Sequence, residues 1–440
     1  MNIYAQVGEK LSAISEYRLM TPLSVMDVIE DGPSITVDEF SIRTSEAARL
    51  KAFLGSDIFV THASVASQVY ETFEKVKNGV PAYEDGILKV PPAICIDIDD
   101  LYTEISHLNP AFGYWGYKRP DGTEMQPGDK ITIDTVDAGE ITLWEDGKLF
   151  NYVKEAKFDL QKNRNKIQRL ANMMLQADIV TCSTPRLKAE LEALHGREVH
   201  VYPNSMVPID WPDVNVHKPK LTVLWQGGSS HHEDLMEIRD GLEYLSNKYP
   251  DIQWIMYGQD FQFIRKAIPA DRIIHHSWVP YEMHKLKMAT LPHDINIAPL
   301  AHTKFNACKS AIKWYESSML RNPAATIASN WGPFADEMVD GETGMLFDDN
   351  DEFVKKMEIL IADAELRRTM GLKSKDWVYA NRLAGRTAPK LYEVYKETVR
   401  KKYETGRRFF PLTGVEQYGV LPSHDFDMGS AKRPRCPRCG

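Results

Sequence analysis

Short apolar runs alternate with helix-period segments along most of the chain. This alternation is typical of βαβ units, in which helices cover both faces of a parallel sheet. The sequence therefore predicts an α/β fold. The expected strands of the first half are residues 3–7, 57–62, 93–97, 179–183 and 199–203, and those of the second half are residues 221–225, 252–257, 273–276, 295–299 and 325–328.

A proline-rich segment separates the two sets of strands. Residues 206–220, MVPIDWPDVNVHKPK, hold three prolines and little periodicity, which indicates a linker. Two Rossmann-like domains joined in this way imply a cleft, because ligands of such sheets bind at the carboxyl ends of the strands. The expected parts are an N-terminal domain (1–207), a linker (208–220), a C-terminal domain (221–386), a crossing helix (387–404) and a basic tail (405–440).

Residues 128–150 depart from the alternation. Apolar and polar positions alternate in GDKITIDTVDAGEITLWEDGKLF, and AG and DG mark turns. We predict a β-hairpin insertion in the first domain.

Composition and charge narrow the class of protein. Of 440 residues, 43% are hydrophobic and 26% charged, a globular mixture, and no window resembles a membrane span or a signal peptide. Five cysteines are too few for a disulfide framework, so we expect a cytoplasmic protein. Residues 400–440 carry nine basic and four acidic side chains, hence +5, which leaves −14 for the rest of a chain whose net charge is −9.

The segment FNACKSAIKWYESSMLRNP, residues 305–323, is the most informative. It predicts a helix after the strand at 295–299, with Lys309 and Ser310 at its start and Ser310 as a cap. Free peptide N–H groups and a lysine favour an anion there, and Glu316 lies where a carboxylate reaches a ribose. An ordinary capped core helix is the alternative.

Two more loops follow strands of the second half. WQGGSSHHEDL, residues 225–235, places Gly227 and Gly228 where backbone approaches a ligand closely, with His231 as a hydrogen-bonding residue for phosphate or sugar. SNWGP, residues 329–333, follows the last predicted strand. If the three loops converge on one nucleotide, together they support a binding site more strongly than any one of them does alone.

Acidic residues end a buried strand of the first domain. In CIDIDD, the spacing of Asp97 and Asp99 suits Mg²⁺ or Mn²⁺ bound through substrate phosphates. Asp99 or Asp100 is also suited to contact an acceptor hydroxyl. The alternative is that these residues are solvated acids of the kind that often ends a strand.

The tail ends in CPRC. Cys436 and Cys439 form half of a zinc site, with His424 as a third candidate ligand, against the alternative of a disordered basic tail.

Taken together, the second-half motifs resemble a known family. The chain is similar to family 4 ("group 1") glycosyltransferases with the GT-B fold in the segments HDINIAPL and FNACKSAIKWYESSMLRNPAATIASNWGPFADEMVDGETGMLF, and in the upstream segments VHVYPNSM and ISEYRLMTPL. The segment WQGGSSHHEDL is similar to a bacterial and phage branch of that family. The resemblance implies a UDP- or GDP-sugar donor, retention at the anomeric carbon and no catalytic metal.

The residue patterns and the resemblance together give the expected roles. The expected catalytic residues are Asp99, Asp100 and Lys309, and the expected donor-binding residues are Gly227, Gly228, His231, Tyr257, Ser310 and Glu316. The chain departs from the family where a first glutamate is expected: Cys308 stands there, followed by Lys309 and Ser310.

Alternative functions remain open at this stage. A nucleotide-sugar epimerase shares the architecture, and the missing glutamate fits an inactive, transferase-like binding module. The expected acceptor is a glycan. The basic, aromatic tail suggests the alternative of a hydroxylated base in phage DNA.

Overall fold

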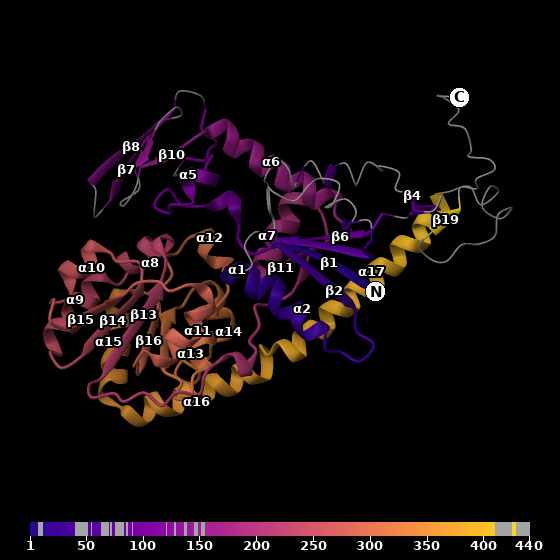
Figure 1. Ribbon diagram of the computed structural model, residues 1–440. Helices are drawn as coiled ribbons and strands as arrows, with labels where there is room; N and C mark the ends of the chain where they lie inside the picture. The colour runs from indigo at the N-terminus through magenta and orange to yellow at the C-terminus, as the bar shows by residue number, and fades with distance from the viewer. Residues whose placement is uncertain are drawn as a thin grey trace.

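The computed structural model contains two domains, each built on a six-stranded parallel sheet (Figure 1). It describes residues 1–7, 12–39, 52–53, 55–62, 70, 73–74, 83–84, 87–89, 91–119, 121–126, 129–135, 139–144, 148–150, 155–409 and 425–427.

The N-terminal sheet has the order β12-β11-β6-β3-β1-β2. Its strands are β1 (Asn2–Val7), β2 (Ser34–Glu39), β3 (Ile58–His62), β6 (Ala93–Ile98), β11 (Ile179–Cys182) and β12 (His200–Val201). Every residue of β6 and β11 is buried, as expected for strands covered on both faces. The chain reverses direction across the sheet between β1 and β3, and such switch points hold ligands at the carboxyl ends of the strands.

Helices cover both faces of this sheet. On one face Ile3 and Ala5 pack against α2 (Thr21–Met26) and α17 (Ala384–Phe409). On the other face Tyr4 belongs to the core completed by α6 (Leu160–Gln176) and α7 (Pro185–His195). The shorter helical segments here are α1 (Ala13–Ser15), the π-helical turn Glu16–Met20, Tyr102–Glu104 and α5 (Phe112–Trp115).

The C-terminal sheet has the order β15-β14-β13-β16-β17-β18, the doubly wound Rossmann order. Its strands are β13 (Thr222–Gly227), β14 (Gln253–Gly258), β15 (Ile273–His276), β16 (Ile295–Ala298), β17 (Ala325–Ser329) and β18 (Met345–Phe347). Val223 and Trp225 face one core and Leu224 faces the other, so the alternating side chains of β13 hold both helical layers.

In chain order, the helices of this domain are α8 (His232–Met236), α9 (Arg239–Lys248), α10 (Gln262–Ala267), α11 (Tyr281–Thr290), α12 (Lys304–Ala307), α13 (Ile312–Ser318), α14 (Gly332–Glu337), α15 (Asn350–Ala362) and α16 (Ala364–Asn381). Side chains of Asp349 and Asp363 cap α15 and α16 by accepting from backbone N–H groups, as Asp at this position commonly does.

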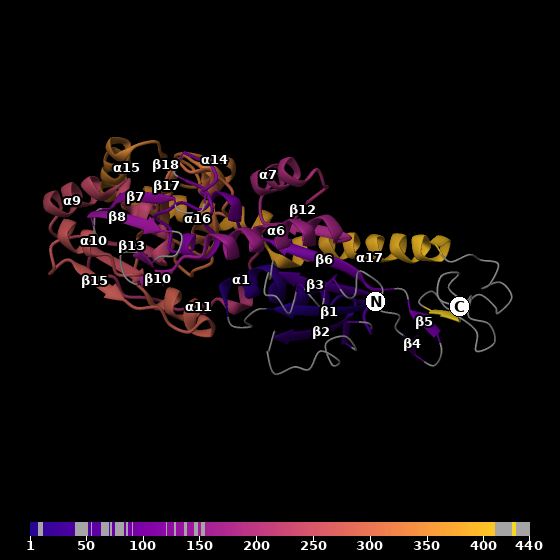
Figure 2. The ribbon, with the colours of Figure 1, turned by 90° about the horizontal axis from the view of Figure 1, so that it is seen from above.

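Antiparallel strand pairs occupy the expected insertion, residues 128–150, and extend beyond it to residue 157. β7 (Lys130–Thr135) pairs with β8 (Gly139–Trp144), and β9 (Lys148–Phe150) pairs with β10 (Glu155–Lys157). Figures 1 and 2 show that these strands extend from the N-terminal domain over the C-terminal domain.

Helix α17 crosses back to the first domain and is longer than the expected 387–404. It runs along the N-terminal domain in both views, and its Leu391, Tyr395 and Val399 pack into that domain's core (Figure 2). Beyond it, β19 (Asp425–Asp427) pairs with β5 (Ile87–Lys89), which also pairs with β4 (Tyr83–Glu84). Cys436, Cys439 and His424 lie outside the described residues. No helix in the described part of the chain is long and apolar enough to cross a membrane.

Close packing of α16 against the start of β17 gives a test of the C-terminal core. A Cβ on Gly371 would lie 2.1 Å from the carbonyl oxygen of Pro323. We expect Gly371→Ala to lower stability by about 1–3 kcal/mol, because overpacking displaces the helix. Gly385→Ala is the matched control, since a Cβ there meets no atom within 4 Å. Urea unfolding midpoints of the two variants measure the difference, and equal midpoints would contradict this packing.

Candidate active site

The carboxyl ends of the two sheets face a cleft of about 320 Å³ between the domains. The N-terminal domain lines it with Ala13, Ile14, Tyr17, Arg18, Asp99, Asp100, Ser183 and Asn204. The C-terminal domain lines it with Gln226, Gly227, Gly228, His231, Trp278, Tyr281, His284, Leu300, Lys309, Ser310, Ile312, Lys313, Glu316 and Phe334. The cleft therefore lies at the place where each sheet order predicts a ligand.

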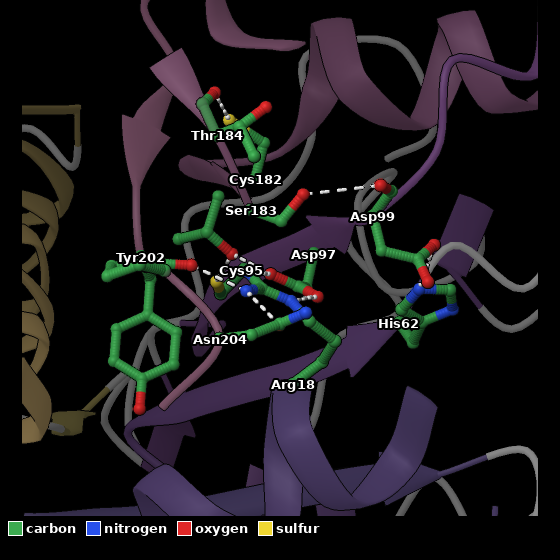
Figure 3. A network of polar contacts seen from close by, with 12 residues as sticks. Arg18, His62, Cys95, Asp97, Asp99, Cys182, Ser183, Thr184, Tyr202 and Asn204 are labelled. Atoms are coloured by element: carbon green, nitrogen blue, oxygen red, sulfur yellow. Dashed lines mark hydrogen bonds and ion pairs between the residues drawn. The ribbon is translucent and has the colours of Figure 1, made fainter. Parts of the chain in front are cut away.

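A buried ion pair forms the floor of the N-terminal side (Figure 3). Arg18 donates to both carboxylate oxygens of Asp97, at 2.9 and 2.6 Å, and Thr181 Oγ1 donates to the same carboxylate at 2.6 Å. Arg18 also donates to the Tyr202 carbonyl oxygen at 2.5 Å and to Asn204 Oδ1 at 3.1 Å. Asp97 is thereby fully engaged inside the protein. The candidate Mg²⁺ or Mn²⁺ role of Asp97 does not agree with this arrangement.

Asp99 pairs with a histidine that we did not select from the sequence. His62 Nε2 lies 2.9 Å from Asp99 Oδ1, and Tyr102 OH donates to the same oxygen at 2.8 Å. Burial opposes the charged form of Asp99, but the charge of His62 and these two hydrogen bonds lower the pKa of Asp99 well below its usual range. Burial likewise opposes the charge of His62, but Asp99 raises the pKa of His62. Asp99 is therefore an ionised, positioned carboxylate.

Asp100 differs from its neighbour. Burial raises the pKa of Asp100 to about 6, a shift that the charge of Lys309 opposes and that of Asp99 reinforces. Two adjacent carboxylates at the edge of the cleft thus have opposite pKa shifts, an arrangement common at sites that hold and move protons.

The glycine loop after β13 forms the opposite wall. A Cβ on Gly228 would meet no atom within 4 Å, so its backbone borders open space in the cleft, whereas a Cβ on Gly227 would collide with Trp225. His231 Nδ1 lies 2.6 Å from Asp234 Oδ2. Burial and the charge of Lys313 lower the pKa of His231 to about 4, against the opposing effect of Asp234, so His231 is neutral.

Lys309 and Ser310 lie in the cleft, but they precede the helix that they were expected to start. α12 ends at Ala307 and α13 begins at Ile312, with Ala311 at the N-cap position and no side-chain cap. Ser310 does not cap the helix as predicted. Its Oγ accepts a hydrogen bond from Asn204 Nδ2 at 2.8 Å, which links the two domains.

Glu316 is held by donors from both domains. Tyr17 OH donates to Oε1 at 2.7 Å, His284 Nε2 lies 3.2 Å from Oε1, and Gln226 Nε2 donates to Oε2 at 2.8 Å. Burial opposes its charge, but His284 and the hydrogen bonds lower the pKa of Glu316. The carboxylate is therefore ionised and fixed at the wall of the cleft.

Tyr257 differs from its expected role as a direct donor contact. Its side chain is fully buried, and it does not line the cleft. Its hydroxyl lies 3.1 Å from His284 Nδ1, so Tyr257 supports the histidine that orients Glu316.

Further contacts hold the domains together beside the cleft. Thr184, the side-chain cap of α7, donates from Oγ1 to the Cys308 carbonyl oxygen at 2.8 Å. Arg186 donates to both oxygens of Asp336, at 2.5 and 2.6 Å. With the Tyr17–Glu316 and Asn204–Ser310 bonds, these contacts fix the spacing of the two walls.

The structure contains no group of three or more His, Cys, Asp or Glu side chains suited to a metal within its described residues. His231 and His232 do not form such a group, since His231 is directed to Asp234 and His232 packs against Phe261 and Phe263.

Sequence reasoning missed Tyr17, Arg18, Gln226, His284 and Lys313, which line the cleft, and His62, which pairs with Asp99 at its edge. His62 ends a predicted strand and Gln226 precedes the glycine loop, so topology was a usable signal for both. Tyr17, Arg18 and His284 lie in helical segments, where only the pairing of the domains brings them to the cleft.

Comparison with proteins of known structure identifies the fold. No protein-family model matches this sequence, and no curated protein does. Several solved structures match along nearly their whole length. The chain is similar to sucrose-phosphate synthase from Thermosynechococcus elongatus, at 12% identity and a TM-score of 0.56 over 90% of this chain and 99% of that one.

Two other structures agree. Anabaena HepE in complex with UDP-glucose matches at 10% identity and a TM-score of 0.56, over 90% of this chain and 99% of that one. A glycosyltransferase from Rickettsia africae matches at 11% identity and a TM-score of 0.54, over 90% and 98%. At such identities the likeness concerns the fold, which is the GT-B fold of two facing Rossmann-like domains. The fold expected from the sequence is confirmed.

The Arg18–Asp97 pair gives a stability test. We expect Arg18→Met to destabilise the protein by about 3–5 kcal/mol, because it leaves a buried carboxylate without its cation. The double variant Arg18→Met/Asp97→Leu is the control and should recover most of the loss, since it removes both charges. Urea unfolding measures both. A single variant as stable as the wild type would show that the pair does not support the floor of the cleft.

Proposed function

We propose that this protein is a glycosyltransferase that moves a sugar from a nucleotide-sugar donor to an acceptor hydroxyl. The observation that carries the proposal is the meeting of Gly227, Gly228, Lys309 and Glu316 in one cleft at the switch point of a Rossmann-like sheet. A diphosphate fits the positive charge of Lys309 and the exposed backbone of the glycine loop, and a ribose fits the oriented carboxylate of Glu316.

The donor is a UDP- or GDP-sugar in this proposal. Support comes from the shared GT-B fold and from HepE, which was solved with UDP-glucose. His231, neutral and held by Asp234, offers a hydrogen bond beside the glycine loop, and Ser310 lies near Lys309.

The acceptor side carries the acidic residues. The ionised Asp99 and the more readily protonated Asp100 border the cleft opposite Lys309 and suit hydrogen bonds with hydroxyl groups of donor sugar and acceptor. In the transfer, the bond from the anomeric carbon to the diphosphate oxygen breaks as the acceptor oxygen bonds to that carbon. The hydroxyl proton passes to the departing diphosphate. We propose retention of configuration and stabilisation of the leaving group by Lys309 without a metal ion.

A glycan hydroxyl is the proposed acceptor. The alternative of a base in phage DNA rested on the tail 405–440, most of which lies outside the described residues, and it forms no part of the proposal. An epimerase or an inactive binding module remains distinguishable by experiment, because an epimerase needs no acceptor and an inactive module releases no product.

Nucleotide binding tests the donor class. We expect UDP or GDP to bind the full-length protein in titration calorimetry, and the matching nucleotide sugar to be turned over in an assay with mass-spectrometric detection of products. The panel is UDP, GDP and ADP with their glucose or mannose derivatives. Failure of every nucleotide to bind would contradict the proposal, and conversion of the donor without an acceptor would favour the epimerase.

Lys309 provides the test of leaving-group stabilisation. We expect Lys309→Met to lower kcat by about 10²–10³-fold, the effect typical of removing one group that stabilises charge in a transition state. Lys355→Met is the matched control, because Lys355 is exposed on α15 outside the cleft. Equal kcat in the Lys309 and Lys355 variants would remove Lys309 from the mechanism.

A further inference from the structure

A second lysine lies in the cleft wall, one turn into the segment that follows Lys309. Lys313 is in α13, and its side chain lines the cleft. Its Nζ atom is buried and has no hydrogen-bond partner among the described residues. A buried ammonium group without hydrogen bonds is costly in a folded protein, so this one calls for a physical reason.

The neighbouring carboxylates are already engaged. Asp234 Oδ2 is bonded to His231, and Asp234 Oδ1 accepts from the Ala301 backbone N–H at 2.8 Å and from Asn306 Nδ2 at 2.7 Å. Glu316 is held by the three donors described above. Both carboxylates act on Lys313 through space, but neither accepts a hydrogen bond from it.

The remaining contact is aromatic. Lys313 Nζ lies 5.3 Å from the centre of the Trp225 ring, at the end of β13 beside the glycine loop. A cation over an indole is attracted to the ring, but the ring satisfies none of the three N–H donors of an ammonium group. Lys313 therefore retains three unused donors at the wall where Gly228 and Lys309 border the cleft.

We propose that Lys313 is a second cationic ligand of the donor, and that its ammonium group donates to oxygens of the nucleoside diphosphate bound between the glycine loop and Lys309. This inference rests on the proposed function and extends it. The bound diphosphate supplies the negative charge and the hydrogen-bond acceptors that the Lys313 side chain lacks in the free protein.

The charge state of Lys313 makes the inference measurable. Burial lowers the pKa of Lys313 to about 8, Asp234 opposes that shift and Lys309 reinforces it. A bound diphosphate favours the charged form and so raises this pKa. Affinity for the diphosphate is thus highest below pH 8 and falls as the pH rises through 8, because binding then requires uptake of a proton.

Other titratable groups face Lys313 from two segments. On the side of the loop and helix after β13 these are His231, whose pKa is lowered to about 4, and Asp234, whose pKa is lowered. On its own segment they are Glu316, whose pKa is lowered, and Lys309. The terminal phosphate of the ligand, with a pKa of about 6, is ionised throughout the range above pH 7. A Lys309→Met variant shows how much Lys309 contributes to the pH dependence of diphosphate binding.

The experiment is titration calorimetry of the full-length protein from pH 7 to about 9.5, in pairs of buffers with different ionisation enthalpies. The probe is whichever of UDP, GDP and ADP binds the wild type most tightly, together with its nucleoside, which has no phosphate. We expect proton uptake near pH 8 on binding of the diphosphate. We expect Lys313→Met to weaken the diphosphate about 10- to 100-fold at pH 7, the range of a hydrogen bond to a charged group, with little change for the nucleoside.

Two variants complete the design. Lys313→Arg keeps a charge that does not titrate in this range, so it should restore most of the affinity and remove the pH dependence. Lys355→Met should bind as the wild type does. Thermal unfolding of each variant without ligand identifies any loss of folding, and the proton uptake of the wild type tests the inference even if Lys313→Met does not fold.

The outcomes separate this inference from the function on which it rests. If no nucleotide binds the wild type, the proposed function fails and the inference falls with it. If the diphosphate binds without proton uptake and Lys313→Met binds it normally, the inference alone is wrong. Equal weakening of nucleoside and diphosphate would also overturn it, because Lys313 would then shape the wall rather than bind phosphate.

Discussion

The constraint on which the rest of the structure depends is the fixed distance between the carboxyl ends of two parallel sheets. Each sheet ends in loops whose peptide groups and side chains face the cleft, and neither set forms a site alone. The hydrogen bond from Tyr17 to Glu316 joins the two sets directly, because a side chain of the first domain orients the carboxylate of the second. Thr184, Arg186 and Asn204 hold the same spacing from the N-terminal side.

The two walls of the cleft carry opposite charges, and this difference favours one orientation of a bound ligand. Asp99 and Asp100 lie on the N-terminal side and Lys309 and Lys313 on the C-terminal side. A ligand with an anionic end and a hydroxyl-rich end fits such a field in one orientation. The buried Arg18 adds no positive charge to the acidic wall, since Asp97 neutralises it.

Much of this architecture is predictable from the sequence, and the failures have physical causes. Buried parallel strands are continuous apolar runs, so the strands ending near Asp99 and Gly227 are evident. β2 and β18 are not, because β2 alternates at an edge and β18 has three residues. Helix α12 is not predicted either, because its four residues are too few to show a helical period.

The residues of the candidate site also divide into those that the sequence predicts and those that it does not. Gly228 and Asp100, close after strand ends, were found because topology gathers strand ends, and Lys309 was found because it stands at the start of a predicted helix. Tyr17, His284 and Lys313 were not, because their place in the cleft depends on helix packing and on the pairing of the domains. Tyr257 lies near the carboxyl end of β14 yet is buried behind His284, so a position at a strand end indicates the neighbourhood of a ligand and not contact with it.

The most direct test of the central claim is a crystal structure of the full-length protein with the nucleoside diphosphate that binds it. The account predicts a diphosphate between the Gly227–Gly228 backbone and the Lys309 ammonium group, with the ribose hydroxyls on Glu316. A nucleotide bound outside the interdomain cleft, or bound there with its ribose away from Glu316, would contradict the account.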